Sequence, residues 1–236
     1  MAAGLMATLR AVIFDFDGVI ADDERLHLAG FRQALASHGI EISEAEYFAR
    51  YVGYDDHDGF VEMLRDHGRE VDEKTISDLM RRKARAFREL VRERVTIYPG
   101  VRRLLDDLRR PPGAVATGIG SGALRGEVEL VLSIAGLSGL FDAIVCADEV
   151  ERSKPDPQTY LRVVERLSAV CPGLMPSECV VIEDTHAGLQ AARRAGIATI
   201  AVTNSYPAAE LDADLVVGSL EELSRERCRS LVSEGR

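Results

Sequence analysis

The spacing of hydrophobic residues changes twice along the chain, and each change predicts a different kind of element. Residues 11–14, AVIF, are apolar without alternation, which is typical of a strand buried on both faces of a parallel sheet. From residue 22 to about residue 95 the apolar positions instead recur at helical spacing, with no strand-like run. From Val101 onward, short apolar runs alternate with amphipathic stretches, as they do in α/β proteins.

Glycines and capping residues set the expected ends of the elements. In the helical region, helices are expected over residues 26–38, 43–51, 60–67 and 72–91, with Ser43 and Asp72 as caps. Beyond it, strands are expected at residues 114–117, 143–147, 180–182, 197–202 and 215–217. The helices expected between them cover residues 101–108, 124–135, 158–169 and 186–195. The charged tail from Arg225 is expected to fray.

These elements predict an α/β protein with two parts. A doubly wound, Rossmann-like parallel-sheet core is expected over residues 1–21 and 96–236. An all-helical cap domain, inserted directly after the first strand, is expected over residues 22–95. The two linkers between the parts would act as a hinge, so that the cap covers the ends of the strands.

Composition and charge limit the classes of binding partner that the protein could have. The chain has 236 residues, 46% hydrophobic and 29% charged, and a formal net charge of −10, which disfavours binding to nucleic acid or to an anionic membrane. No apolar run reaches membrane-spanning length, and the first ten residues do not resemble a signal peptide. The four cysteines form no CxxC pair, so reduced thiols in a cytoplasmic protein are expected. A monomer or weak dimer is expected.

Two carboxylates stand where the first strand ends. Asp15 and Asp17 directly follow the apolar run and are separated by one residue, with Gly18 behind them. Buried carboxylates are costly to desolvate unless a cation or a reaction partner is present. The carboxyl ends of strands are also where open α/β sheets bind ligands. The alternative is a surface turn that uses Asp and Gly for their turn geometry.

Three later stretches follow or end strands in the same way. Thr117 is expected to end the second strand, leaving its hydroxyl and the N–H of Gly118 to face a ligand. Lys154 is held in a loop stiffened by prolines, and Glu183-Asp184 ends the fourth strand. Alone, each stretch has an ordinary interpretation. Thr117-Gly118 is typical of a turn, Lys154-Pro155 of a loop, and Glu183-Asp184 of acidic residues that compensate a helix dipole. Together they predict carboxylates for a hard cation such as Mg²⁺ and donors for a phosphate.

These four stretches, in this order, resemble the motifs of the haloacid dehalogenase-like superfamily. The motifs are DFDGV at residues 15–19, Thr117, Lys154-Pro155, and Glu183-Asp184 with Gly188. The position of the helical insertion is similar to the β-phosphoglucomutase and sugar-phosphate phosphatase subgroup, and the likeness covers the whole chain. It implies a sheet in which the first strand lies between those carrying Thr117 and Glu183.

The resemblance also implies a role for each motif residue. Asp15 would be the nucleophile that becomes an aspartyl phosphate, and Asp17 would protonate the leaving oxygen and later accept a proton from water. The implied Mg²⁺ ligands are the Asp15 carboxylate, the Asp17 backbone carbonyl, Asp184 and, directly or through water, Glu183. The implied phosphate-binding groups are Thr117, the Gly118 N–H and Lys154. Dehalogenation would need no second aspartate, so Asp17 favours phosphoryl transfer.

The cap carries weaker signals about the substrate. Gly18, His27, Gly53 and Lys83 match substrate-facing or hinge positions of the subgroup, although His27 is equally typical of an ordinary polar helix position. After Gly53 the mutases carry an arginine for the second phosphate of their substrate, whereas this chain reads YDDHD over residues 54–58. Acidic residues there would repel a second phosphate unless Lys83, Arg81 or Arg82 turns inward to compensate.

The sequence therefore predicts an Mg²⁺-dependent phosphatase that hydrolyses a small phosphorylated metabolite, a sugar phosphate or similar phosphomonoester, through an aspartyl-phosphate intermediate. The alternative is a hexose-phosphate mutase of the β-phosphoglucomutase type. A weaker alternative is a non-enzymatic protein that binds phosphorylated metabolites, for which Asp17 would have no use.

Overall fold

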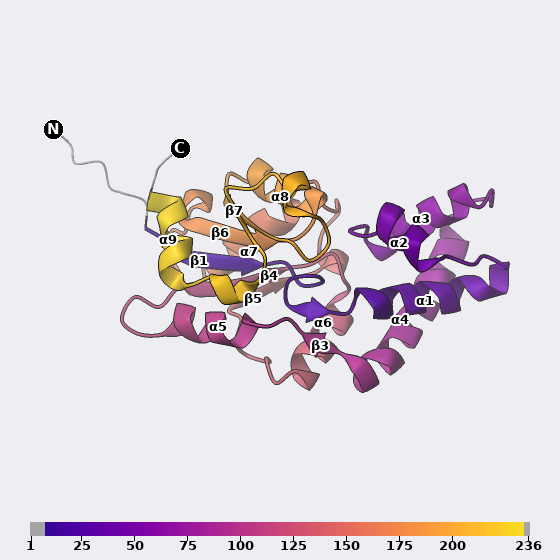
Figure 1. The fold of residues 1–236 in the computed structure, drawn as a ribbon, viewed down its shortest axis with the longest axis horizontal. Coiled ribbons are helices and arrows are strands. Elements are labelled where there is room, and N and C mark those ends of the chain that lie inside the picture. The colour runs from indigo at the N-terminus through magenta and orange to yellow at the C-terminus, as the bar shows by residue number, and fades with distance from the viewer. Residues whose placement is uncertain (1–7, 234–236) are drawn as a thin grey trace.

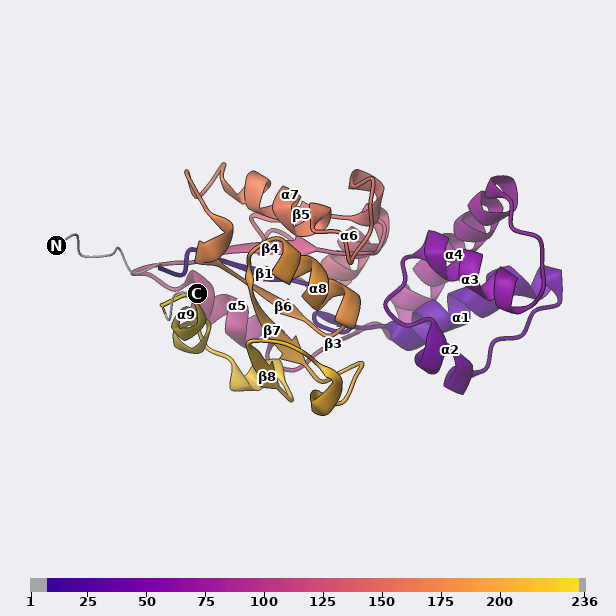
Figure 2. The ribbon, with the colours of Figure 1, turned by 90° about the horizontal axis from the view of Figure 1, so that it is seen from above.

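The computed structural model describes residues 8–233, in which a parallel sheet with flanking helices joins a separate layer of four helices (Figures 1 and 2). The sheet has the order β5-β4-β1-β6-β7-β8, all strands parallel. Its strands are β1 (Ala11–Phe14), β4 (Ala116–Gly120), β5 (Ala143–Val145), β6 (Cys179–Glu183), β7 (Ala198–Val202) and β8 (Leu215–Val217). The predicted fold class is confirmed, and β1 lies between β4 and β6 as expected.

Helices cover both faces of the sheet, which explains the unbroken apolar run of β1. They are α5 (Val101–Arg109), α6 (Arg125–Ile134), α7 (Gln158–Leu167), α8 (His186–Arg194) and α9 (Arg225–Ser233). Val12 and Phe14 pack in the apolar cluster with α5, α6 and α9. Ala11 and Ile13 point to the other face, toward α7 and α8. Every side chain of β1 is therefore buried, whichever face it takes.

The helical layer has an apolar cluster of its own. Its helices are α1 (Glu24–Leu35), α2 (Glu44–Arg50), α3 (Asp56–Asp66) and α4 (Glu73–Arg94). Phe31, Phe60, Met63 and Leu79 are among the side chains buried in this cluster. The predicted caps are present, because the Ser43 side chain accepts from the N–H of Glu46, and that of Asp72 from the N–H of Thr75. We refer to residues 24–94 as the cap.

A short two-stranded ribbon joins the cap to the sheet. β2 (Ala21–Asp22) pairs antiparallel with β3 (Thr96–Ile97), so the chain enters and leaves the cap side by side. No strand is predicted here from the hydrophobic pattern, because two residues are too few to show alternation. The expected boundaries, after residues 21 and 95, fall within or beside these strands, and their use as a hinge stays a prediction.

The expectation that the tail frays from Arg225 is wrong. Arg225 begins α9, and its guanidinium donates to the carbonyl oxygens of Arg110, Pro112 and Gly113. Cys228 is fully buried against the sheet core. The few apolar residues of this charged segment therefore all face one way, which anchors the helix.

The strand expected at residues 114–117 lies further along the chain, at Ala116–Gly120. Gly118 and Gly120 sit inside this strand, where the sequence suggests a turn. An added Cβ at Gly118 would lie 2.6 Å from Val163, and one at Gly120 would lie 3.0 Å from Tyr160. These glycines let α7 pack closely on the sheet, so they serve packing and not a turn. Within the described chain, no helix combines the length and the apolar character that a membrane span requires.

Candidate active site

The carboxylates predicted at the strand ends meet around one lysine. Asp15 follows β1, Glu183 ends the neighbouring β6, and Asp184 comes directly after it. The Lys154 ammonium lies 2.6 Å from Asp15 Oδ1 and 2.8 Å from Glu183 Oε1. All three carboxylates are buried. The structure therefore brings together four residues that the sequence places up to 169 positions apart.

Glu183 uses both of its oxygens within the protein. Its Oε1 accepts from Lys154 and, at 2.7 Å, from the Tyr160 hydroxyl. Its Oε2 accepts from the N–H of Asp184 and from the N–H and hydroxyl of Thr185, each at 2.9 Å. Burial alone would raise the pKa of Glu183, but Lys154 and these hydrogen bonds lower it. Glu183 thus holds Lys154 and the loop after β6 in place.

Asp184, by contrast, keeps one oxygen free. Its Oδ2 accepts from Ser205, while its Oδ1 is buried and has no hydrogen-bond partner in residues 8–233. Burial and the charges of Glu183 and Asp15 raise the pKa of Asp184 well above its ordinary value. Burial and the charge of Glu183 likewise raise the pKa of Asp15 to about 8, against the effect of Lys154. The carboxylates therefore outnumber the positive charge available to them.

This surplus of carboxylate fits a hard divalent cation. One oxygen each of Asp15, Glu183 and Asp184 lie within 4.8 Å of one another. The unpartnered oxygen of Asp184 is the donor that such an ion would satisfy, and Mg²⁺ prefers carboxylate and water oxygens. Gly18 makes room for this group: it has φ +78°, and a Cβ there would lie 1.9 Å from Asp184 Oδ2.

Asp17 faces a histidine from the cap. Its Oδ1 lies 3.4 Å from His27 Nε2, and the His27 ring is buried against Phe87. Burial alone would raise the pKa of Asp17, but the hydrogen bond of His27 and the charges of Lys83 and Lys154 lower it. Of the two interpretations of His27, the structure supports the one that places it beside Asp17.

Lys83 lies inside the molecule and not on a solvated helix face. Its side chain has no exposed surface, and its ammonium lies 2.7 Å from Asp56 Oδ1 and 2.7 Å from His27 Nδ1. It also lies 3.6 Å from Glu127 Oε2 of the core. Arg81 and Arg82 point outward and pair with Asp78. We refer to residues 54–58, which lead into the first turn of α3, as the acidic loop, and neither arginine compensates its charge.

Thr117 and Gly118 lie away from this edge, so their prediction as phosphate-binding residues is wrong. The Thr117 hydroxyl donates to Leu140 O at 2.9 Å, and its N–H donates to Asp142 at 2.8 Å, near the amino end of β4. Gly118 is inside the strand, beside Ile13 of β1. The sequence pattern ended the strand too early, because it took Gly118 as the start of a turn.

Ser121 takes the place expected for Thr117. Phe14 pairs with Ile119, so the residue level with Asp15 is Gly120, and Ser121 is the first residue beyond the strand. The Ser121 side chain is buried and accepts from the N–H of Ala123, while Gly122 lines the cavity beside Asp15. The signal that could have found it is strand length, since neighbouring parallel strands end at about the same level.

A small cavity of about 60 Å³ lies between these residues and the cap, which has room for a few water-sized molecules. Its cap wall includes Glu24, His27, Gly53, Tyr54, Asp55 and Asp56. Gly53 lies against the core, where an added Cβ would be 3.3 Å from Thr185. Asp55 accepts a hydrogen bond from Ser153 of the core. The acidic loop therefore faces the site.

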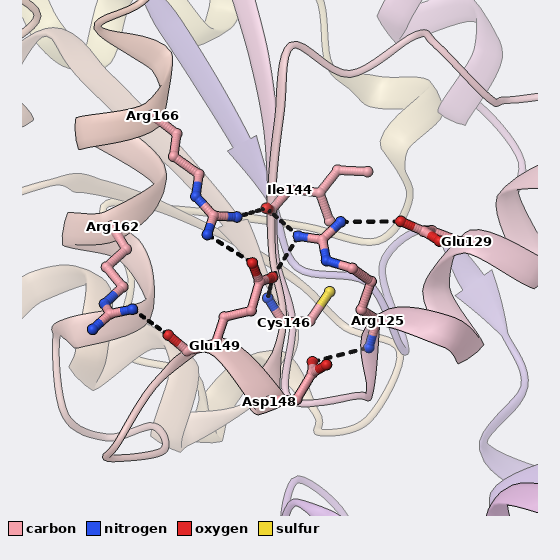
Figure 3. Close-up of polar contacts among 8 residues, drawn as sticks. All are labelled: Arg125, Glu129, Ile144, Cys146, Asp148, Glu149, Arg162 and Arg166. Atoms are coloured by element: carbon pink, nitrogen blue, oxygen red, sulfur yellow. Dashed lines mark hydrogen bonds and ion pairs between the residues drawn. The ribbon is translucent and has the colours of Figure 1, made fainter.

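A second polar cluster supports the loop that leads to Lys154 (Figure 3). Glu149 accepts from Arg166 and Arg125 and, at 3.0 Å, from the N–H of Cys146. Arg125 also donates to Ile144 O and to Glu129. Its guanidinium is thus committed to these partners and does not line the cavity, although α6 begins close to the site.

This combination of a parallel sheet, a helical cap and a carboxylate–lysine cluster at the sheet edge is the layout of a capped α/β enzyme. The model of the haloacid dehalogenase-like hydrolase family matches residues 12–202, and the chain belongs to this family. The predicted family is confirmed.

Three relatives illustrate the subgroup. The phosphorylated carbohydrates phosphatase of Thermotoga maritima is 34% identical over 81% of this chain and 84% of its own. The fructose-1-phosphate phosphatase YqaB of Escherichia coli is 30% identical over 81% of this chain and 95% of its own. The crystal structure of a β-phosphoglucomutase from Clostridium difficile matches with a TM-score of 0.84 and 26% identity, over 96% of this chain and 98% of its own.

Proposed function

We propose that this phosphoric monoester hydrolase removes the phosphate from a small monophosphorylated sugar or polyol, through an aspartyl phosphate formed on Asp15. The observation that carries the proposal is the arrangement at the carboxyl edge of β1. Asp15 lies against Lys154, with the unpartnered oxygen of Asp184 on one side. Asp17, held by His27, stands two residues further on.

The residues divide the reaction into two displacements at phosphorus. In the first, an Asp15 oxygen bonds to phosphorus as the bond to the leaving oxygen breaks, and Asp17 gives that oxygen its proton. In the second, Asp17 takes a proton from water, whose oxygen bonds to phosphorus and releases phosphate and Asp15. The ammonium of Lys154 and the donors of Ser121 and Gly122 offset the charge of the transferring group.

Mg²⁺ is the proposed cofactor. Asp15, Asp184 and the backbone of Asp17 would hold it, because both oxygens of Glu183 are already occupied by protein donors. A bound Mg²⁺ supplies positive charge that neutralises the carboxylates and the phosphate. Glu183 would act indirectly, by holding Lys154.

The cap wall favours a substrate with one phosphate. Among the described residues that line the cavity, Lys154 is the only lysine or arginine. Its ammonium is already paired with the nucleophile Asp15. Lys83 is paired with Asp56, so its ammonium is not available to bind a second phosphate. The two related phosphatases act on phosphorylated carbohydrates and on fructose 1-phosphate, according to their names. The mutase alternative rests on the likeness to the β-phosphoglucomutase structure.

The proposal is tested by measuring phosphate release from a panel of phosphomonoesters, with Mg²⁺ or with EDTA. The panel includes fructose 1-phosphate and β-glucose 1-phosphate, the latter with a trace of glucose 1,6-bisphosphate. We expect release only with Mg²⁺, and a fall of at least about 100-fold in Asp15→Asn. Glucose 6-phosphate appearing without phosphate release would establish the mutase instead. Binding of these esters without any turnover would establish a non-enzymatic role.

A further inference from the structure

Glu127 is a buried carboxylate that the proposed reaction does not use. It lies on α6 of the core with 3% of its surface exposed, and neither side-chain oxygen has a hydrogen-bond partner in residues 8–233. A buried carboxylate without hydrogen bonds is costly, unless a nearby cation compensates it. The cation here is Lys83, whose ammonium lies 3.6 Å from Glu127 Oε2.

This contact crosses from the core to the cap. Lys83 lies on α4 and Glu127 on α6, and these two helices pack together. The other partners of the ammonium, Asp56 and His27, both belong to the cap. In the described chain, the carboxylates that form ion pairs with Lys83 are Asp56 of the cap and Glu127 of the core, so the contact with Glu127 requires the cap to lie on the core.

Lys83 in turn fixes the hydrogen bonding of His27. A lysine ammonium donates hydrogen bonds and accepts none, so the His27 Nδ1 at 2.7 Å accepts. An imidazole that accepts at Nδ1 carries its proton at Nε2. That nitrogen lies 3.4 Å from Asp17 Oδ1. The N–H of His27 thus points at the carboxylate that the proposed reaction uses as its acid and base.

We propose that Glu127 is a positioning residue that completes this chain of contacts when the cap covers the site. Its charge holds the Lys83 ammonium toward His27, and His27 then orients Asp17 toward the leaving oxygen. The inference rests on the proposed role of Asp17. It adds a reason why α6 carries a buried carboxylate facing the cap.

Glu127→Gln tests the inference, because it removes the charge and keeps the shape. Glu129→Gln is the matched control, since Glu129 is on the same helix with 58% of its side chain exposed. Leaving-group release in the first turnover is measured with fructose 1-phosphate, whose leaving oxygen needs a proton, and with p-nitrophenyl phosphate, whose leaving group departs without one. We expect Glu127→Gln to slow the sugar ester about tenfold and the nitrophenyl ester by less than about twofold. The control should change neither.

Equal slowing of both esters would indicate a structural role and overturn the inference, as would unchanged rates for both. Wild-type protein that turns over neither ester would instead refute the proposed function. If Glu127→Gln does not fold, Glu127→Asp, which keeps the charge, replaces it, and we expect intermediate slowing of the sugar ester alone.

A double-mutant cycle tests whether Glu127 acts through Lys83. In a Lys83→Met background, Glu127→Gln should cause no further slowing of the sugar ester, whereas additive losses would contradict the mechanism. The ¹⁵N chemical shifts of His27, assigned with His27→Gln, should show protonation at Nε2 alone in the wild type. A ring protonated at both nitrogens would overturn the inference.

Discussion

Two glycines define the site because carboxylates occupy the space of their missing side chains. An added Cβ at Gly188 would lie 1.5 Å from Glu183 Oε1, and one at Gly18 would lie 1.9 Å from Asp184 Oδ2. Gly188 also donates its N–H to the Thr185 side chain, which holds Glu183 from the other side. Glu183 and Asp184 can therefore take these positions only because Gly188 and Gly18 have no side chain.

Gly188→Ala should therefore disturb Glu183 and, through it, Lys154. We expect a loss of about 1–3 kcal/mol in the free energy of unfolding and a fall in kcat of at least tenfold. Gly126→Ala is the control: Gly126 lies in α6, and an added Cβ meets nothing within 4 Å. It should raise stability by up to about 1 kcal/mol and leave kcat unchanged. Denaturant unfolding and steady-state kinetics of both variants measure these effects, and a Gly188→Ala enzyme with normal kcat would contradict the account.

At the scale of elements, the end of β4 decides which hydroxyl lies at the carboxyl edge of the sheet. The strand extends to Gly120, so Ser121 stands level with the catalytic edge and Thr117 lies about one strand-length away from it. Thr117 instead ties β4 to the loop at Leu140 and Asp142. We therefore expect its buried hydroxyl to contribute to stability and not to the reaction.

Substitutions at the two positions should thus differ in their effect on the reaction. Ser121→Ala should lower kcat/KM at least tenfold, and it should also lower stability by about 1–3 kcal/mol, because the buried N–H of Ala123 loses its acceptor. Thr117→Val should lower stability by about 1–3 kcal/mol, since it removes a buried hydrogen bond, and should leave kcat/KM within about twofold. Kinetics and thermal unfolding of both variants provide the test. A Thr117→Val enzyme that is stable but inactive would restore Thr117 to the site.

Some elements could be predicted from the sequence and others could not. The spacing of apolar residues predicts the sheet and the cap, and the residue types where the apolar runs end predict the carboxylates after β1 and β6. The predicted end of β4 is wrong, because its glycines allow close packing against α7 and do not form a turn. The spacing also misses the β2–β3 ribbon, which is too short for a period. It offers no sign of the Glu127–Lys83 contact, which depends on how α6 and α4 meet in space.

At the scale of the whole molecule, the core and the cap both contribute residues to the site. The core supplies Asp15, Lys154 and Asp184, while the cap supplies His27 and the acidic loop. Contacts that cross between the cap and the core beside the cavity include the hydrogen bond of Ser153 with Asp55, the contact of His27 with Asp17, and the ion pair of Lys83 with Glu127. Because the cavity between the cap and the core is small, we expect the cap to move when a sugar phosphate enters, with the β2–β3 ribbon as the place of movement.

The most direct test of the central claim is to trap the phosphorylated nucleophile. The enzyme is mixed with Mg²⁺ and its best substrate, quenched within one turnover, and treated with borohydride, which reduces an acyl phosphate to an alcohol. Peptide mass spectrometry should then find homoserine at position 15, dependent on substrate and Mg²⁺, and absent from Asp15→Asn. Turnover without any reduced residue at position 15, or with the reduced residue elsewhere, would contradict the account.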